Sequence, residues 1–191
     1  MVTDKKNETQ IEETIKRVGL RLSDLISTKL KILFNCKFVE KKLVTYETIQ
    51  QLDRKFYTFT LLHNKKQPIM QIMDTNIIYI LTNRILGGEG IVEVRRFKEL
   101  FTFSENYFGR FFIDWIIEAF ANNGLDLSLD KIADSPKYYH LYLPEEKIMQ
   151  FVFEIYIGPQ NIGMYYICFD PALDLKKESV EHKELPVETK N

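Results

Sequence analysis

Cysteine and histidine are scarce in this chain of 191 residues, which contains two cysteines and three histidines. Cys36 and Cys168 lie far apart, and no pair of cysteines or histidines has the short spacing of a metal site. Each cysteine lies in an apolar run, which favours a small buried side chain over a catalytic thiol. We therefore expect no metal, no cofactor, and thiols typical of a reducing compartment.

The chain also lacks an excess of charge of one sign and a long apolar run. Lysine plus arginine number 26 and aspartate plus glutamate 27, whereas nucleic-acid-binding proteins usually carry a basic excess. No apolar run approaches the ~20 residues of a membrane-spanning helix, and residues 1–17 contain no apolar signal segment. We expect a soluble, cytoplasmic protein with protein or small-molecule partners, without nucleic acid and without an integral membrane segment.

Two long segments repeat apolar residues at intervals of three and four, the period of an amphipathic helix. The first is Glu8–Leu33; the second, Thr102–Asn123, begins with a capping box completed by Glu105. Ile113 and Ile117 widen the second helix's apolar face, so we expect surplus apolar surface and side-by-side self-association through both helices. The main face, which we expect in the core, consists of Tyr107, Phe108, Phe111, Phe112, Trp115, Ile116, Ala119 and Phe120.

Segments between turn residues predict strands between and after these helices, and Leu125–Ile132 alternates as a short strand would. Turns at residues 63–66 and 158–161 are expected to close two β-hairpins, so His63 is interpreted as a solvated turn residue. Thr45 is the expected cap of a short helix that ends near Leu52. The expected strands are Cys36–Val44, Phe56–Leu62, Gln67–Met73, Leu125–Ile132, Tyr138–Leu143, Ile148–Ile157 and Ile162–Phe169.

The order of these elements repeats. Each half of the chain contains a long helix, a strand, a hairpin and an aspartate at a helix start, Asp74 and then Asp170. Two such units combine most simply into one sheet flanked by helices, with a pseudo-twofold axis between the halves. We predict an α/β (α+β) fold, a three-layer α/β/α sandwich formed by one domain at residues 8–175. Residues 1–7 are expected to be a flexible N-terminus, and residues 176–191 a charged, disordered tail.

The helix that starts at Asp74 runs into a loop with three glycines within four residues, Gly87-Gly88-Glu89-Gly90. One residue with positive φ is enough to end a helix, and Gly87 is the expected cap. Gly88 and Gly90 then indicate either a very tight turn or a partner that approaches the backbone closely. A phosphate site is disfavoured, because phosphate-binding glycine loops precede a helix, and this loop follows one.

Other motifs accompany the loop in a characteristic order. They are Val44-Thr45-Tyr46-Glu47, Leu86-Gly87-Gly88-Glu89-Gly90, Phe101-Thr102-x-x-Glu105, Leu143-Pro144-x-Glu146 and Ile167-Cys168-Phe169-Asp170-Pro171. In this order and spacing, residues 11–175 resemble the middle domain of the flagellar motor switch protein FliM. That family is related in fold to the chemotaxis phosphatases CheC and CheX, so the resemblance implies a CheC-like fold.

The resemblance implies a non-enzymatic subunit of the bacterial flagellar motor switch, the C-ring, which generates torque and switches rotation in chemotaxis. In that family copies stand side by side in the ring, and the glycine loop contacts FliG. The implied partners are a FliG-like protein and ring neighbours, with FliN-like or FliY-like proteins as further candidates. The implied location is cytoplasmic, peripheral to the inner membrane at the flagellar basal body. The implied partner-binding residues are Arg84, Gly87, Gly88, Glu89 and Gly90.

Two departures from FliM leave alternatives open. Residues 1–13 contain nothing that looks like the FliM segment that captures phosphorylated CheY. There is also no room after residue 175 for the C-terminal domain that joins FliN. The sequence is consistent with a domain fragment, a shortened paralogue or a relative that has left the motor.

The main alternative function is a phosphatase of the CheC and CheX type, acting on phosphorylated CheY. Those enzymes use a glutamate and an asparagine three residues later on a helix, where the amide positions the attacking water. The only such pair here is Glu188 and Asn191, in the expected tail, where neither side chain is held in place. We therefore expect no enzymatic activity.

Overall fold

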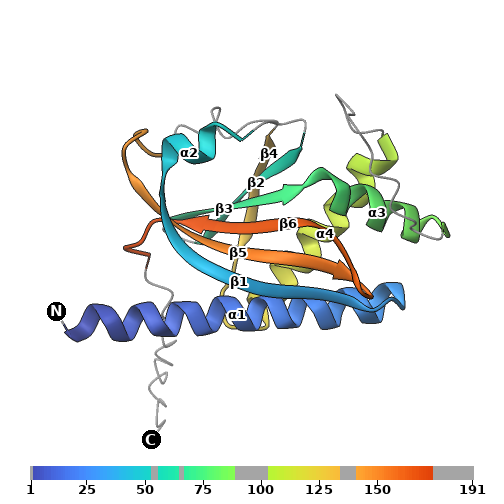
Figure 1. Cartoon of the computed structure of the whole chain (residues 1–191), viewed down its shortest axis with the longest axis horizontal. Helices are drawn as coiled ribbons and strands as arrows, with labels where there is room; N and C mark the ends of the chain where they lie inside the picture. Colours follow the sequence, from blue (N-terminus) through green and yellow to red (C-terminus); the bar gives the residue numbers. More distant parts are fainter. Residues whose placement is uncertain (1, 53–55, 65–66, 89–102, 134–140, 174–191) are drawn as a thin grey trace, which may run out of the picture.

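The structure is a computed structural model that describes residues 2–52, 56–64, 67–88, 103–133 and 141–173. It contains helices and strands in mixed order (Figure 1). The helices are α1 (Val2–Leu30), α2 (Tyr46–Gln50), α3 (Thr75–Ile85) and α4 (Phe103–Ala121). The strands are β1 (Phe34–Thr45), β2 (Tyr57–Asn64), β3 (Gln67–Asp74), β4 (Ser128–Ala133), β5 (Lys147–Ile157) and β6 (Gln160–Phe169).

The strands form one antiparallel sheet in the order β1-β5-β6-β3-β2-β4. This order is symmetric about the central pair, where Ile69 of β3 lies opposite Phe169 of β6 and Met73 opposite Tyr165. The symmetry exchanges β1 with β4, β5 with β2, and β6 with β3. The repeat of element order in the sequence therefore corresponds to a repeat in the sheet.

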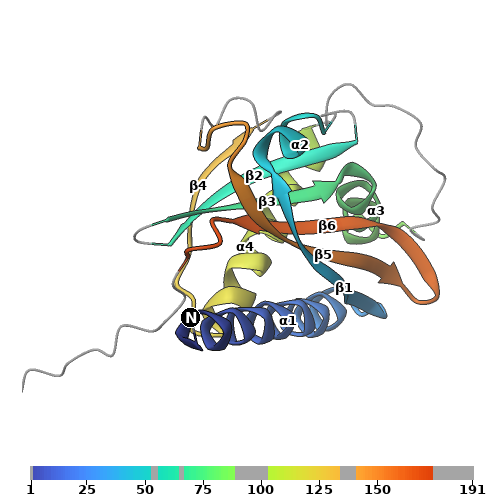
Figure 2. The same ribbon diagram turned by 60° about the vertical axis from the view of Figure 1, so that its left-hand side comes forward.

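The two faces of the sheet are covered unequally (Figure 2). The larger apolar cluster joins one face to α1, α3 and α4, through residues such as Ile26, Leu81 and Phe120. The smaller cluster lies on the other face, where Tyr46 and Ile49 of the short α2 pack on Met70 and Ile72. The predicted mixed α and β fold is confirmed, but in the described residues one of the two helical layers consists of α2 alone.

Most expected elements are confirmed with shifted ends. α1 begins at Val2 and ends at Leu30, because Lys31 leaves the helical conformation with φ of +54°. Thr45 caps α2 by accepting a hydrogen bond from the Thr48 amide at 3.4 Å. Both hairpins form, as β2 with β3 and β5 with β6. The expected tail at residues 176–191 and the capping threonine at position 102 lie outside the described residues.

Three local expectations differ from the structure. His63 lies within β2 opposite Pro68, because the strand continues to Asn64, and its Nε2 is 3.3 Å from Asp130 Oδ2. Asp170 accepts a hydrogen bond from the Ala172 amide at 2.7 Å, but this closes a turn, and no helix follows within the described residues up to Leu173. Of the expected strand at 138–143, residues 138–140 lie outside the description and residues 141–143 form no strand.

The buried face of α4 is only partly the face that the sequence suggested, since Phe112, Ile116, Ala119 and Phe120 are buried as expected. Phe112, Ile113 and Ile116 are buried, whereas Tyr107 is 54% exposed and Phe111 38% exposed. α4 is apolar nearly all round, so periodicity alone did not fix which side meets the sheet. Ile113 and Ile117 therefore belong to the core and its margin rather than to surplus surface. The exposed apolar surface of α4 lies along Tyr107, Phe108, Phe111 and Trp115, which we call the aromatic stripe.

Both cysteines are buried and unpaired, as the sequence predicted. Burial raises the pKa of the Cys36 thiol well above its ordinary value and that of Cys168 to about 12. Ser23 of α1 accepts a hydrogen bond from the Cys36 amide at 2.8 Å, which ties α1 to β1. The thiols therefore serve packing.

Candidate partner-binding site

The candidate loop is positioned by α3, which starts directly after β3. The carboxylate of Asp74 caps the helix by accepting a hydrogen bond from the Asn76 amide at 2.9 Å. Burial raises the pKa of Asp74, and the hydrogen bond from Asn76 opposes that rise. Ile77, Ile80 and Leu81 are buried in the larger cluster, so one face of α3 is fixed against the sheet and its C-terminus is held at the surface.

α3 ends in a Schellman motif centred on Gly87. The Gly87 amide donates to the Arg84 carbonyl at 3.1 Å, and the Gly88 amide donates to the Asn83 carbonyl at 2.9 Å. Gly87 has φ of +85°, a left-handed conformation that disfavours any side chain. The prediction that Gly87 is the cap is therefore confirmed. Among the described residues, no atom lies within 4 Å of the position that a Gly87 Cβ would occupy.

Gly88 is a glycine for a different reason. Its φ is outside the left-handed region, so the backbone alone does not require glycine there. A Cβ at this position would meet the side chain of Asn83, whose Cγ would be 2.6 Å away. Asn83 thus lies against the bare backbone of Gly88 and covers one side of it. A side chain at position 88 requires the Asn83 amide to move.

The surroundings of the cap are partly apolar and partly cationic. Leu86, directly before Gly87, is 63% exposed. Arg84 lies in the last turn of α3, where a cation complements the negative end of the helix dipole. Its buried Nε has no hydrogen-bond partner within the described part of the chain. Two of the predicted site residues, Glu89 and Gly90, lie outside the described residues, so Arg84, Gly87 and Gly88 are the three whose places are known.

Sequence reasoning did not single out Asn83 or Leu86. Asn83 supplies both the carbonyl that receives the Gly88 amide and the side chain that covers Gly88. The sequence did contain a signal for Asn83, because a Schellman motif joins the amide of Gly88 to the carbonyl of the residue five positions earlier, and that residue is polar. Leu86 stood out only as an apolar residue at a helix end.

No group of three or more histidine, cysteine, aspartate or glutamate side chains is arranged to hold a metal ion in the residues that are described. Over the same residues, no helix is both long enough and apolar enough to cross a bilayer.

Comparison with known proteins gives a match in structure. No protein-family model matches the sequence, and no curated protein sequence matches it. FliM in the FliG–FliM complex from H. pylori superposes with a TM-score of 0.76 at 16% identity, covering 87% of this chain and 93% of that one. The FliM middle domain from Vibrio alginolyticus gives a TM-score of 0.70 at 13% identity, covering 83% and 91%.

FliY from Thermotoga maritima is similar as well, with a TM-score of 0.69 at 12% identity, covering 89% of this chain and 91% of that one. Identities this low establish a shared fold and leave function to be argued from the site. The chain therefore has the fold of FliM middle domains and of FliY, as its resemblance in sequence predicted.

Proposed function

We propose that this chain is a non-enzymatic subunit of the bacterial flagellar motor switch that binds a FliG-like protein through the loop after α3. The observation that carries the proposal is the combination of a FliM-like fold with a glycine backbone at the end of α3, which among the described residues is open at Gly87 and covered on one side of Gly88 by the Asn83 side chain. One of the similar structures is FliM in a complex with FliG. In this chain the proposed contact residues are Arg84, Gly87, Gly88, Glu89 and Gly90, on the cytoplasmic face of the basal body.

The surface of the loop is suited to a partner that reads the backbone. Exposed Gly87 and its neighbour Leu86 offer backbone polar groups beside an apolar side chain. Arg84 adds a half-buried guanidinium that can donate to a carboxylate or carbonyl of the partner. A side chain at position 88 would hold such a partner away from the backbone.

We also propose that copies associate side by side through α1 and α4. The exposed apolar residues that support this are Leu20 of α1, which is 63% exposed, and Tyr107 and Phe111 of the aromatic stripe. α1 and α4 already contact each other within one chain, where Lys29 Nζ is 3.4 Å from Glu118 Oε2. Sedimentation that shows only monomer at every accessible concentration would contradict this part of the proposal.

The proposal includes the absence of phosphatase activity. The required spacing of glutamate and asparagine occurs only at Glu188 and Asn191, outside the described residues, and in none of the described helices. Incubation with phosphorylated CheY at equal concentration should leave the rate of spontaneous dephosphorylation unchanged. A severalfold acceleration would make the CheC-like alternative correct.

Binding to FliG from the same organism tests the main proposal. Gly88→Val should abolish binding in a pull-down and in calorimetry, while the denaturant midpoint stays close to that of the unmodified chain. The double variant Asn83→Ala, Gly88→Val gives the new side chain more room. It should also fail to bind, because the partner still meets a side chain where the backbone was bare.

Gly124→Ala is the matched control for loss of stability. Gly124 has φ of +81° and ends α4 with the same hydrogen bonds that Gly87 makes at the end of α3. Gly87→Ala and Gly124→Ala should therefore lower the stability of the chain by similar amounts, but only Gly87→Ala should weaken FliG binding. Full binding by a folded Gly88→Val chain would remove the loop from the contact with FliG.

A further inference from the structure

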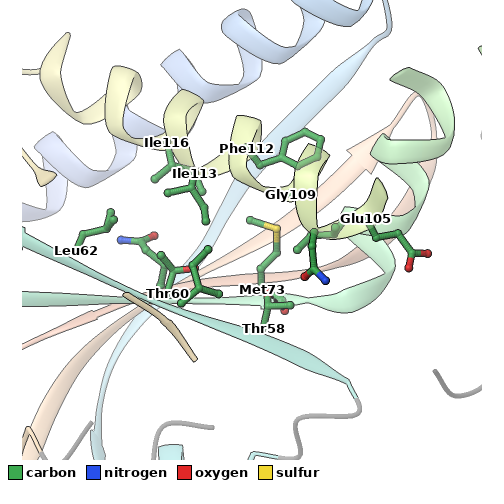
Figure 3. Close-up of a pocket in the computed structure, with 13 residues that line it drawn as sticks. Thr58, Thr60, Leu62, Met73, Glu105, Gly109, Phe112, Ile113 and Ile116 are labelled. Carbon is green, nitrogen blue, oxygen red and sulfur yellow. Dashed lines mark hydrogen bonds between the residues drawn. The ribbon is translucent and has the colours of Figure 1, made fainter. Parts of the chain in front are cut away.

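A cavity of about 50 Å³ lies between α4 and the sheet, away from the loop after α3. Its walls come from β2, β3, β4, α3 and α4, and Figure 3 shows Thr58, Thr60 and Met73 opposite Ile113 and Ile116. The cavity opens beside Asn106 and Ile132, and both residues are exposed. A small molecule therefore has a route from solvent to an otherwise apolar interior.

One polar group in the wall lacks a partner. Gln71 of β3 is only 3% exposed and lines the cavity. Its Oε1 accepts a hydrogen bond from the Tyr165 hydroxyl, which fixes the amide. Its Nε2 has no hydrogen-bond partner within the described residues. A buried donor of this kind is costly unless an acceptor reaches it, so we expect the cavity to hold an acceptor atom, which water or a ligand can supply.

A glycine in α4 enlarges the same cavity without a structural need. Gly109 is buried in the middle of the helix, and its φ is not left-handed. A Cβ there would come no closer than 3.6 Å to Ile78, an ordinary contact. Alanine is the better helix former, so glycine at this position is unfavourable for the helix. What glycine provides is space in the wall.

The size and charge of the cavity limit what can occupy it. A single buried water needs only about 10–15 Å³, and an engineered apolar cavity of about 150 Å³ accepts benzene. The cavity here is of intermediate size and fits a molecule of about two to four non-hydrogen atoms. Glu105 is the only ionisable side chain among the described lining residues, and its carboxylate points away from the others in Figure 3. A charged occupant would have no counter-ion, which favours a neutral one.

We infer that this cavity is a binding site for a small neutral organic molecule with a carbonyl or hydroxyl oxygen and a short apolar body. The oxygen accepts a hydrogen bond from Gln71 Nε2. The apolar body packs on Met73, Ile78, Phe112, Ile113 and Ile116, with the bare backbone of Gly109 beside it. This site is independent of the proposed contact with FliG.

Acetone is a suitable probe, because it has one acceptor oxygen, four non-hydrogen atoms and no charge. In a titration of the full chain with isoleucine methyl groups labelled for NMR, the Ile113 and Ile116 signals should shift and saturate. The methyl signals of Ile72 and Ile148, on the other face of the sheet, should stay in place and act as the internal control. Xenon, which has no acceptor, should bind more weakly than acetone.

Two variants test the assigned contacts. Gly109→Ala removes no hydrogen bond and should weaken acetone binding at least about fivefold by filling space while leaving the chain folded. Gln71→Leu removes the donor and should weaken binding by a similar factor, of the size expected for one hydrogen bond. Shifts that grow linearly without saturation would overturn the inference and leave a cavity that holds only water. Unchanged acetone affinity in a folded Gly109→Ala chain would overturn it too.

Discussion

Helices α1 and α3 end with the same backbone arrangement but with different residues. At the end of α3, Gly87 occupies the left-handed position, with φ of +85°. At the end of α1, Lys31 occupies it with φ of +54°, and the Ile32 amide donates to the Ser27 carbonyl at 3.3 Å. Lysine tolerates this conformation only at a cost of roughly 1–2 kcal/mol. The motif alone therefore does not demand glycine.

The difference separates two explanations of the glycine loop. Gly87 is sufficiently explained by the helix end, because it removes a strain that α1 accepts at Lys31. The helix end does not explain Gly88, because its φ is outside the left-handed region. The atoms that a Cβ at position 88 would meet belong to the Asn83 side chain, which can move, and not to the backbone. Compared with the end of α1, the end of α3 therefore has one glycine that the helix end does not explain, Gly88.

The largest expected loss of stability comes from placing, at the end of α3, a residue that tolerates positive φ less well than Lys31 does at the end of α1. Gly87→Val places a β-branched side chain at positive φ and should lower the free energy of unfolding by at least about 2 kcal/mol. Urea denaturation measures this change. A loss below a few tenths of a kcal/mol would show that the loop adapts freely and that the comparison with Lys31 is irrelevant.

The N-terminal end of α3 provides a reference for the strength of a cap. Asp74→Ala removes the hydrogen bond to the Asn76 amide and should lower stability by about 1 kcal/mol, whereas Asp74→Asn keeps an acceptor and should lose less.

The same carboxyl also predicts a dependence on pH. Because burial raises the pKa of Asp74 in the fold, its contribution to stability is fully present below the unfolded value of about 3.9. That contribution falls as the pH rises through the higher folded value. The stability of the unmodified chain relative to Asp74→Asn should therefore fall as the pH rises. An opposite slope would show that the hydrogen bond outweighs burial.

A smaller gain is expected from making the end of α1 resemble the end of α3. Lys31→Gly relieves the left-handed strain, partly offset by the greater freedom of glycine in the unfolded chain, and should stabilise the fold by roughly 0.5–1 kcal/mol. Thermal unfolding should show a higher midpoint. Lys31→Ala is the control, because alanine removes the lysine side chain but keeps the strain.

The smallest effect is expected at Gly88. Gly88→Ala should change stability by less than about 0.5 kcal/mol, because the backbone conformation suits alanine and the Asn83 side chain can rotate. Comparison with Asn83→Ala and the double variant measures the coupling of the two positions. A large loss that Asn83→Ala relieves would mean that Asn83 is held rigidly against the loop.

Much of this fold could be predicted from the sequence because its helices, strands and caps depend on residues that are close together in the chain. The helical period of α1 and the apolar runs of β5 and β6 follow from which residues must be buried, and the caps at Thr45, Asp74 and Gly87 follow from backbone hydrogen bonding. The repeat of element order also predicted a symmetric sheet. Helix and strand ends moved by a few residues, since neighbouring contacts decide them.

Features that depend on distant partners were not predictable. The orientation of α4 depends on how the sheet meets a helix that is apolar on nearly every side, so Tyr107 and Phe111 were wrongly expected in the core. Gln71 is buried because Tyr165, far along the chain, supplies its hydrogen bond. The glycine loop was visible in the sequence, but the division of roles between Gly87 and Gly88 required φ angles and the position of Asn83.

The strand order also determines when the chain can fold during synthesis. Among the described strands, β1 pairs only with β5 and β4 pairs only with β2, so the edge strand of each half of the chain depends on the hairpin of the other half. A nascent chain that has just completed α3 holds β1 without a neighbour. Such non-local pairing slows folding and leaves strand edges exposed until residues near Phe169 have been made. Division of the chain between the halves would therefore give two pieces that each need the other to complete a sheet.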